Sequence, residues 1–446
     1  MSRLLALRLP VFVALAAWLS VGCVDSAPPP HVGQAPRPPV TAPPPPVPPP
    51  APAPVAPPAP APAADPVELD RPLVLGAADT ALALHAGRVV VDIDVPASSF
   101  VSVGVFGPQR ALLGFEIVEV RRAALEPPAS PAESASLDTT PPAATPPTVP
   151  TSAVPMSAVP IPAVPPPTVD TAAMDSALSH LRAHRPLDED GLLPRIVSFR
   201  SLPEAITIRV LVDAAEDVEI RRVAAPLTGP EPLPEKGRRY RPAQAPSIGF
   251  PAPVSRDEGF FLQSAARYQF ARTDVIASLL RAFQRTRAKF KRDPIAIADI
   301  SQWDGVRPAT DLGKPRHISH EGGRDVDLAL AANDEEPSTV RAHCTGVLIE
   351  ETTQGCGPGT VRGFDAQRMA YFLGALFETS PPVEKIFVDD VYLRELRKAA
   401  ERLHDKRVLK DAGFEGLSDD AIVRASPWHT DHLHVRFAGP PGKPAF

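Results

Sequence analysis

The chain is poor in cysteine, in aromatic residues and in positive charge. Three cysteines in 446 residues are too few for a disulfide-rich scaffold, and only 6% of the residues are aromatic. The formal net charge of -6 gives no basic excess of the kind that nucleic-acid binding requires. Proline is abundant instead. With 60 prolines against 26 glycines, the sequence excludes one continuous globular fold.

The N-terminus has the layout of a secretory signal. Two arginines precede an apolar run, Leu9–Leu19, which is shorter than the ~20 residues of a membrane span and ends in small residues before Cys23. This layout resembles a bacterial lipoprotein signal, although Ser20 stands where leucine is usual. The resemblance implies removal of residues 1–22, lipidation of Cys23 and a lipid-anchored periplasmic protein at the outer membrane. The alternative is an ordinary cleaved signal with Cys23 as a bystander.

Composition divides the remaining chain into segments. Proline- and alanine-rich stretches cannot bury a core and favour an extended chain, whereas runs that alternate apolar and polar residues before and after the second stretch indicate one small β module in two parts. We expect a tether (23–68), the first part of the β module (69–125), a disordered insert (126–169), a short helix with the second part (170–228), a linker (229–245) and a C-terminal domain (246–446).

The C-terminal domain has the pattern of an α+β fold. Apolar residues with helical spacing follow Thr273 or Asp274, either of which can cap the helix, and a second helix opens at Asp365. A third helix runs through Leu393, Leu396 and Leu403. Strands are predicted at residues 294–298, 326–330, 385–388 and 432–437. About 200 residues suffice for one core.

Five of the 11 histidines fall into two short clusters. His317 and His320 form one, and the other contains His429, His432 and His434. If 432–437 is a strand, its period of two places His432 and His434 on one face and apolar residues on the other. The imidazole face can therefore line a site while the opposite face packs.

The predicted strand around residue 326 offers a carboxylate to these histidines. Asp325 and Asp327 share a face, and a strand beside the histidine strand would bring them to the imidazoles. His320 reaches that strand through the flexible segment 321–323. Two imidazoles and one carboxylate leave a fourth tetrahedral position open, which is the ligand count of a hydrolytic zinc site. The chain has no His-Glu-x-x-His helix, which excludes a thermolysin-type architecture. It also has no complete phosphate-binding loop, so we expect no nucleotide.

These residues also carry a family resemblance. The spacing His320-x6-Asp327 followed by His432-x-His434 looks like the metal signature shared by lysostaphin-type, D-Ala-D-Ala carboxypeptidase and hedgehog-like domains. The chain is similar, more specifically, to the penicillin-insensitive murein endopeptidases. The likeness covers the last ~200 residues and follows the order 247–249, 262–264, 268–269, 272–274, 317–327, 385–388 and 428–436.

The resemblance implies a zinc metallopeptidase that cuts peptidoglycan crosslinks between D-Ala and meso-diaminopimelate. It also implies a hedgehog- or D-Ala-D-Ala-peptidase-like domain with a central, mostly antiparallel sheet flanked by helices. Carried over by position, His320, Asp327 and His434 bind zinc and His432 is the catalytic base. His429 would support catalysis from beside the site. We expect one zinc ion; His317, as the holder of a second metal or as an assisting residue, remains open.

Other residues have weaker indications. Asp325 is expected to support the ligands rather than bind the metal. Arg324, Arg362, Arg436 and Trp428 are candidates for contact with the stem peptide, with ion pairing or core packing as the alternative. Cys344 and Cys356 flank a glycine-containing loop and are expected to form a disulfide in an oxidising envelope.

Two other functions stay open at this stage. One is a zinc D,D-carboxypeptidase that trims terminal D-Ala from muropeptides with the same site. The other is a non-catalytic lipoprotein that binds peptidoglycan and uses zinc only for its fold. In each case the expected partners are peptidoglycan and, through the lipid anchor, the membrane.

Overall fold

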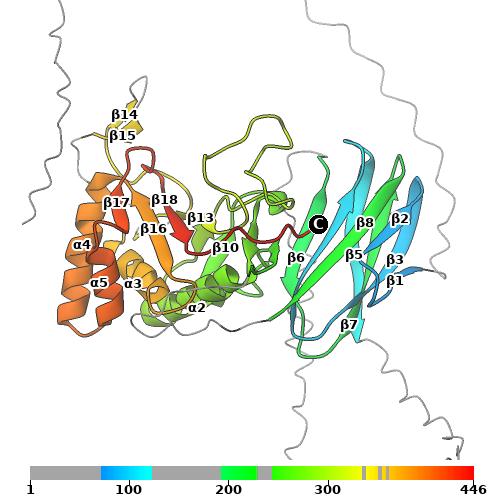
Figure 1. Cartoon of the computed structure of the whole chain (residues 1–446), viewed down its shortest axis with the longest axis horizontal. Coiled ribbons are helices and arrows are strands. Elements are labelled where there is room, and N and C mark those ends of the chain that lie inside the picture. Colours follow the sequence, from blue (N-terminus) through cyan, green and yellow to red (C-terminus); the bar gives the residue numbers. More distant parts are fainter. Residues whose placement is uncertain are drawn as a thin grey trace, which may run out of the picture. The chain divides into compact units, whose positions relative to one another are not determined.

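The computed structural model describes residues 72–122, 192–227, 229, 244–333, 338–349, 354–357 and 361–446. The predicted signal, Cys23, the tether, the proline-rich insert, the short helix before residue 192 and most of the linker lie outside this part. The fold is mixed α and β and consists mostly of sheets, as Figure 1 shows. None of the described helices is long and apolar enough to cross a membrane.

The first described region consists of two four-stranded sheets, with strand orders β1-β3-β7-β5 and β2-β8-β4-β6. Most neighbouring strands are antiparallel, and β1 pairs with β3 in parallel. Seven of the strands match the strand-like runs of the sequence at 82–84, 89–95, 100–105, 115–120, 195–199, 206–212 and 218–223. The three-residue β1 was not predicted. The strands are Leu73–Leu75 (β1), Ala81–Leu84 (β2), Gly87–Val95 (β3), Ser99–Phe106 (β4), Leu112–Arg122 (β5), Arg195–Arg200 (β6), Ile206–Ala214 (β7) and Val218–Pro226 (β8).

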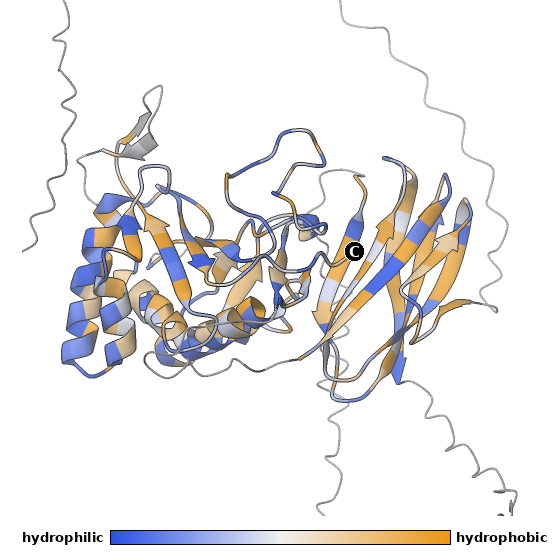
Figure 2. Ribbon diagram, in the orientation of Figure 1, coloured by the Kyte–Doolittle hydropathy of each residue, from blue (hydrophilic) through white to orange (hydrophobic). Residues whose placement is uncertain are grey.

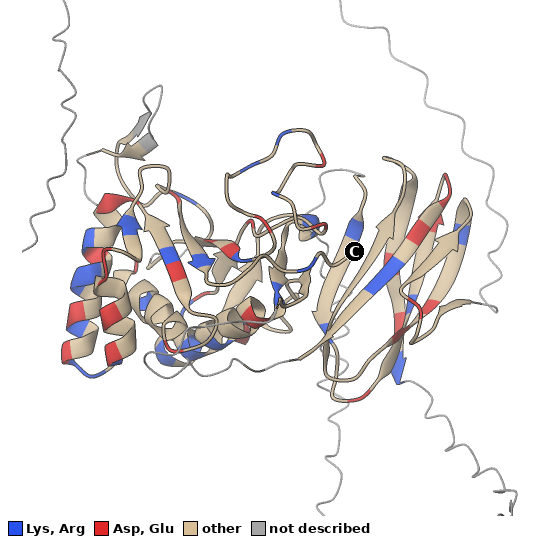
Figure 3. Ribbon diagram, viewed as in Figure 1, with Lys and Arg blue, Asp and Glu red and all other residues tan. Residues whose placement is uncertain are grey.

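Alternation of side chains gives this region its core. Val91, Ile93 and Val95 of β3 are buried and pack with Ile208 and Val210 of β7 in one hydrophobic cluster. Such a cluster forms because successive side chains of a strand point to opposite faces, so that every second residue enters the core. Figure 2 shows hydrophobic residues along the strands, and Figure 3 shows charged residues of both signs on the same strands.

The C-terminal region is built on a six-stranded sheet with the order β10-β12-β13-β18-β16-β17. Its middle pairs, β12-β13, β13-β18 and β18-β16, are antiparallel, and the two outer pairs are parallel. The strands are Phe260–Leu262 (β10), Ile295–Ile297 (β12), Asp325–Ala329 (β13), Val383–Val388 (β16), Val423–Ala425 (β17) and His432–Phe437 (β18). Two separate antiparallel pairs are Ser247–Gly249 (β9) with Phe270–Arg272 (β11), and Val347–Ile349 (β14) with Gln354–Cys356 (β15).

Four described α-helices pack with this sheet and share its hydrophobic core. They are Thr273–Phe290 (α2), Ala366–Leu376 (α3), Asp390–Asp405 (α4) and Asp411–Ser418 (α5). Asp365 caps α3 as predicted, since its side chain accepts a hydrogen bond from the backbone N–H of Arg368. The predicted N-cap of α2, Thr273 or Asp274, was wrong, because both residues lie within the helix. Its N-cap is Arg272, which makes no side-chain cap and instead pairs with Asp274.

Candidate metal centre

The centre of the site is the pairing of β13 with β18. In this antiparallel register Asp327 lies opposite His434, Asp325 opposite Arg436 and Ala329 opposite His432. Asp325, Asp327 and His434 are all buried. The two strands lie side by side in Figure 1 although about a hundred residues separate them in the chain. The prediction that Asp325 and Asp327 share a strand beside the histidines is therefore confirmed.

His320 reaches the same place from the loop before β13. Gly322 and Gly323 have φ values of +64° and +67°, a region that glycine adopts without strain. A Cβ atom at Gly323 would also lie 2.7 Å from the Cα of Ala271, so that no larger residue fits. These two glycines turn the chain sharply between His320 and β13. The Nδ1 atom of His320 then lies 2.8 Å from the carbonyl oxygen of Ile300, and the ring is fully buried.

Three potential ligand atoms converge at this point. His320 Nε2 lies 3.0 Å from His434 Nδ1 and 3.2 Å from Asp327 Oδ1, and His434 Nδ1 lies 3.1 Å from Asp327 Oδ1. Ligand atoms of a tetrahedral zinc ion with bonds of about 2.0–2.1 Å lie roughly 3.3 Å apart. The three atoms therefore have nearly the mutual spacing that one such ion requires.

The outer hydrogen bonds of the two histidines determine which ring nitrogen carries its proton. His320 Nδ1 faces a carbonyl and therefore donates, which leaves Nε2 with a lone pair. His434 Nε2 lies 2.8 Å from Asp325 Oδ1 and donates to it, which leaves Nδ1 with a lone pair. In the neutral rings, two lone pairs and a carboxylate oxygen thus point at one another, an arrangement that a metal ion or a proton between them would stabilise.

The charges around the site also favour a cation at this position. Burial opposes protonation of His434, but hydrogen bonds to Asp325 and Asp327 overcome it and raise the pKa of His434 to about 9. Burial also opposes ionisation of Asp327, yet the charges of His320 and His432 hold its pKa well below the usual range. A proton on His434 and a metal ion therefore compete for the same position.

His317 belongs to the cluster as well. His317, His320 and Asp327 each offer an atom within 4.8 Å of the others, so this group could hold a metal ion. His317 Nε2 lies 3.0 Å from Asp299 Oδ2 and 3.5 Å from Asp327 Oδ2. Its N–H is used in a hydrogen bond to Asp299. His317 also has a φ of +61°, unusual for a residue with a side chain. The strained backbone holds its ring beside Asp299 and Asp327.

His432 and His429 lie beside the ligand atoms but differ in environment. His432 Nδ1 lies 2.6 Å from Asp431 Oδ1, and its Nε2 is 3.8 Å from Asp327 Oδ1. Burial lowers the pKa of His432, but Asp327 and Asp431 outweigh this and raise it. For His429, burial and the charge of His432 lower the pKa to about 4, so this ring stays neutral. Its Nδ1 lies 2.8 Å from the hydroxyl oxygen of Ser426.

A cavity of about 450 Å³ opens next to this cluster. Among the described residues, Asp327, His317 and His432 line it, and His429, His320 and His434 do not. Two further lining residues, Asp299 and Arg316, were not singled out from the sequence. Both had a signal there, since Asp299 follows a predicted buried strand and Arg316 precedes His317. The remaining lining residues are Gln263, Ser264, Ala265, Ala298, Val340 and Asp431.

The arginines and the tryptophan predicted to contact substrate lie elsewhere. Arg436 Nε donates to Asp325 Oδ1 over 2.7 Å, and Arg324 Nε lies 3.7 Å from Asp325 Oδ2. Neither lines the cavity, and both balance the charge of the carboxylate that orients His434. Arg362 is also outside the cavity lining, as is Trp428, which is 54% exposed beside His429.

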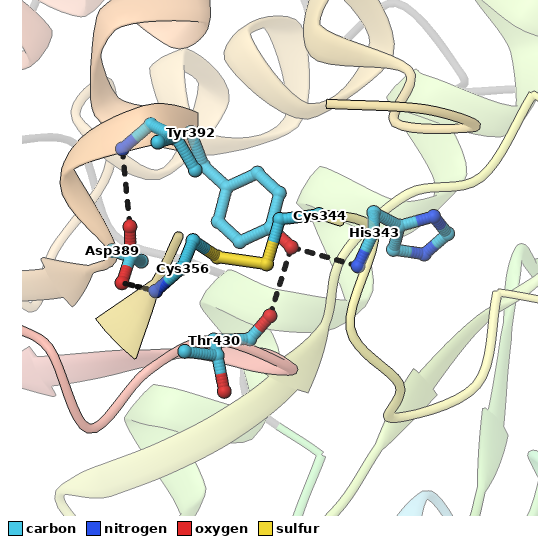
Figure 4. The surroundings of a disulfide bond; sticks show 7 residues. His343, Cys344, Cys356, Asp389, Tyr392 and Thr430 are labelled. Carbon is cyan, nitrogen blue, oxygen red and sulfur yellow. Dashed lines mark hydrogen bonds between the residues drawn. A yellow bond between two sulfur atoms is a disulfide. The ribbon is translucent and has the colours of Figure 1, made fainter. Parts of the chain in front are cut away.

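A disulfide joins Cys344 to Cys356, as the sequence indicated. Figure 4 shows that Asp389 and Tyr392 surround it. The Tyr392 hydroxyl accepts from the backbone N–H of His343 and donates to the carbonyl of Thr430. Asp389 accepts from the N–H of Cys356. The disulfide loop is thereby linked to the backbone between His429 and His432.

No protein-family model, curated protein or solved structure matches this chain. The candidate site is therefore defined by its own contacts. The group of residues that could hold a metal ion, His317, His320 and Asp327, shares His320 and Asp327 with the ligand set predicted from the sequence.

Proposed function

We propose that this chain is a zinc-dependent murein endopeptidase that hydrolyses D-Ala to meso-diaminopimelate crosslinks of peptidoglycan. The observation that carries the proposal is the convergence of one ring nitrogen each of His320 and His434 with a carboxylate oxygen of Asp327. The substrate class comes from the resemblance of residues 317–327 and 428–436 to the penicillin-insensitive murein endopeptidases. On this proposal the C-terminal region has the hedgehog- or D-Ala-D-Ala-peptidase-like fold.

The donor set fits zinc in composition and in support. Imidazole and carboxylate are common zinc ligands, and each imidazole donates its other N–H to an oxygen, as is typical of metal-binding histidines. Three protein ligands leave a position for water or substrate. Bound zinc would lower the pKa of a water molecule towards 7 and polarise the scissile carbonyl.

His432 has the geometry of a general base. In the neutral ring that donates its Nδ1–H to Asp431, Nε2 carries the lone pair, and His432 lines the cavity. In hydrolysis the oxygen of water bonds to the carbonyl carbon, and the C–N bond breaks. His432 Nε2 takes a proton from the water and delivers it to the leaving nitrogen. His317 and His429 support this step, since their rings lie 6.4 and 5.0 Å from that of His432.

Such a mechanism uses water rather than a serine nucleophile. β-Lactams inhibit enzymes that they acylate, and a water-based reaction offers them no nucleophile to trap. We therefore expect hydrolysis by this chain to be unaffected by penicillin. The proposal also places the protein in the periplasm, attached through Cys23 to the outer membrane, with peptidoglycan as its partner.

The decisive experiment compares His432→Ala with His404→Ala, a matched change at a partly exposed histidine of α4. Crosslinked muropeptide dimers are digested and analysed by mass spectrometry, and zinc is quantified in each protein. Loss of a general base costs roughly 10²–10⁴-fold in rate. We expect His432→Ala to lose that activity with zinc still bound, and His404→Ala to match the wild type.

Other outcomes favour the alternative functions. Removal of one D-Ala from pentapeptide monomers, with dimers left intact, would identify a D,D-carboxypeptidase. Zinc bound by a wild-type protein that hydrolyses neither substrate would instead identify a non-catalytic wall-binding protein.

A further inference from the structure

The cavity is rich in negative charge and has one permanent cation. Asp299, Asp327 and Asp431 line it, and Arg316 is the only lysine or arginine among its described lining residues. A substrate group with a negative charge would be repelled by these carboxylates unless a cation receives it. Apart from the proposed zinc ion, Arg316 is therefore the position among the described lining residues where an anionic group can bind.

Arg316 is held in place on one edge and one face. Its Nε atom lies 3.3 Å from Asp299 Oδ2, and its guanidinium lies over the ring of Tyr268, 5.0 Å from the centroid. Tyr268 is itself fixed, because its hydroxyl donates to Asp311 over 3.0 Å. The Arg316 side chain is still 46% exposed. Among the described residues, no acceptor pairs with its Nη groups.

We propose that Arg316 forms the subsite for the free carboxylate of the residue on the leaving side of the scissile bond. This inference rests on the function proposed above. In a D-Ala to meso-diaminopimelate crosslink, the carbon that bears the leaving nitrogen also bears a carboxylate. That carboxylate is only three bonds from the carbonyl carbon that water attacks. Its receptor must therefore lie beside the catalytic groups, and Arg316 directly precedes His317.

The chemistry of the guanidinium suits this role. Arginine can bind a carboxylate through two parallel N–H···O bonds, which sets orientation as well as affinity. A neutral amide in place of the carboxylate loses the charge of that contact and offers only one acceptor oxygen. Arg324 and Arg436 cannot substitute, because both are paired with Asp325 away from the cavity. The subsite thus distinguishes a free carboxylate from an amidated one.

The test combines substitutions of Arg316 with one change in the substrate. Wild type, Arg316→Gln and Arg316→Lys are compared on crosslinked dimers whose leaving diaminopimelate carries either the free carboxylate or its amide. A hydrogen bond to a charged group contributes about 1.5–3 kcal/mol, which corresponds to roughly 10–150-fold. We expect the wild type to prefer the free carboxylate by that factor in kcat/KM. Arg316→Gln should lose the preference, and Arg316→Lys should keep part of it.

The control is Arg394→Gln, which removes the same charge from an exposed pair on α4. It should retain the wild-type preference. A preference that persists in Arg316→Gln, or a wild type that does not discriminate, would overturn the subsite. If the wild type hydrolyses neither dimer, the proposed function fails while the subsite remains testable. Calorimetric binding of the same two dimers to wild type and Arg316→Gln then decides, by the same loss or retention of preference.

Discussion

Two strands of this protein carry almost the same pattern and use it differently. β3 contains Asp92 and Asp94, and β13 contains Asp325 and Asp327, each pair separated by one apolar residue. In both strands the apolar residue between the two aspartates is buried in a core. The sequence of either strand alone therefore does not reveal which pair of carboxylates forms a site.

The neighbouring strand makes the difference. Asp92 lies opposite Arg209 and accepts hydrogen bonds from its Nε and Nη2 at 2.8 and 3.1 Å, and Arg121 pairs with it too. Asp327 lies opposite His434 instead. Arginine is always charged and neutralises a carboxylate permanently, whereas an imidazole can exchange its proton for a metal ion and then offers a lone pair beside the carboxylate. The same pattern is structural beside arginine and suited to a cation beside histidine.

Asp327→Asn, in the strand that pairs with the histidines, should have the largest effect on zinc affinity. It removes the carboxylate from the three converging atoms, and we expect zinc affinity to fall by more than about 100-fold, beyond the usual effect of losing an outer partner. Hydrolysis should fall with zinc occupancy. Competition with a chromophoric chelator measures the affinity. Affinity close to that of the wild type would show that the ion, if bound, does not use Asp327.

Asp325→Asn should have a smaller effect. Asp325 does not belong to the converging set but accepts the Nε2–H of His434 and pairs with Arg436. Loss of such a support costs roughly 10–100-fold in metal affinity. The same chelator titration should place this variant between the wild type and Asp327→Asn. A loss as large as that of Asp327→Asn would mean that Asp325 is itself a ligand.

Asp92→Asn should have the smallest effect of the three on zinc affinity, which we expect to stay unchanged. The carboxylate is nearly buried while its arginine partners are partly exposed, so we expect a loss of about 1–3 kcal/mol in the free energy of unfolding. Chemical denaturation measures that loss. Zinc affinity should stay within twofold of the wild type. A larger change would show that Asp92 of β3 also affects the metal site.

Much of the architecture could be predicted because its pattern is local. The period of two located β3, β13 and β18, and the apolar spacing after Asp365 located α3. The pairing of β13 with β18 was expected because each presents an apolar face and a polar face with matching chemistry. His320 and Asp327 came together as their spacing suggested.

The features that were missed depend on contacts across the fold. Asp299 lies in the site because β12 pairs with β13, which no local pattern encodes. Arg316 is distinguished from Arg324 and Arg436 only by where its neighbours are: Asp299 and Tyr268 hold it at the cavity, while Asp325 holds the other two elsewhere. The three-residue strands β1 and β9 are too short to show any period.

The register of β13 against β18 also affects how the molecule acquires its native form. A slip of one residue would turn every side chain of one strand to the opposite face, and Asp327 would no longer meet His434. A divalent cation that binds only the correct register would stabilise it by mass action, the more so as its concentration exceeds the dissociation constant. Metal present during refolding would then favour the correct alignment of the two strands, before any substrate binds.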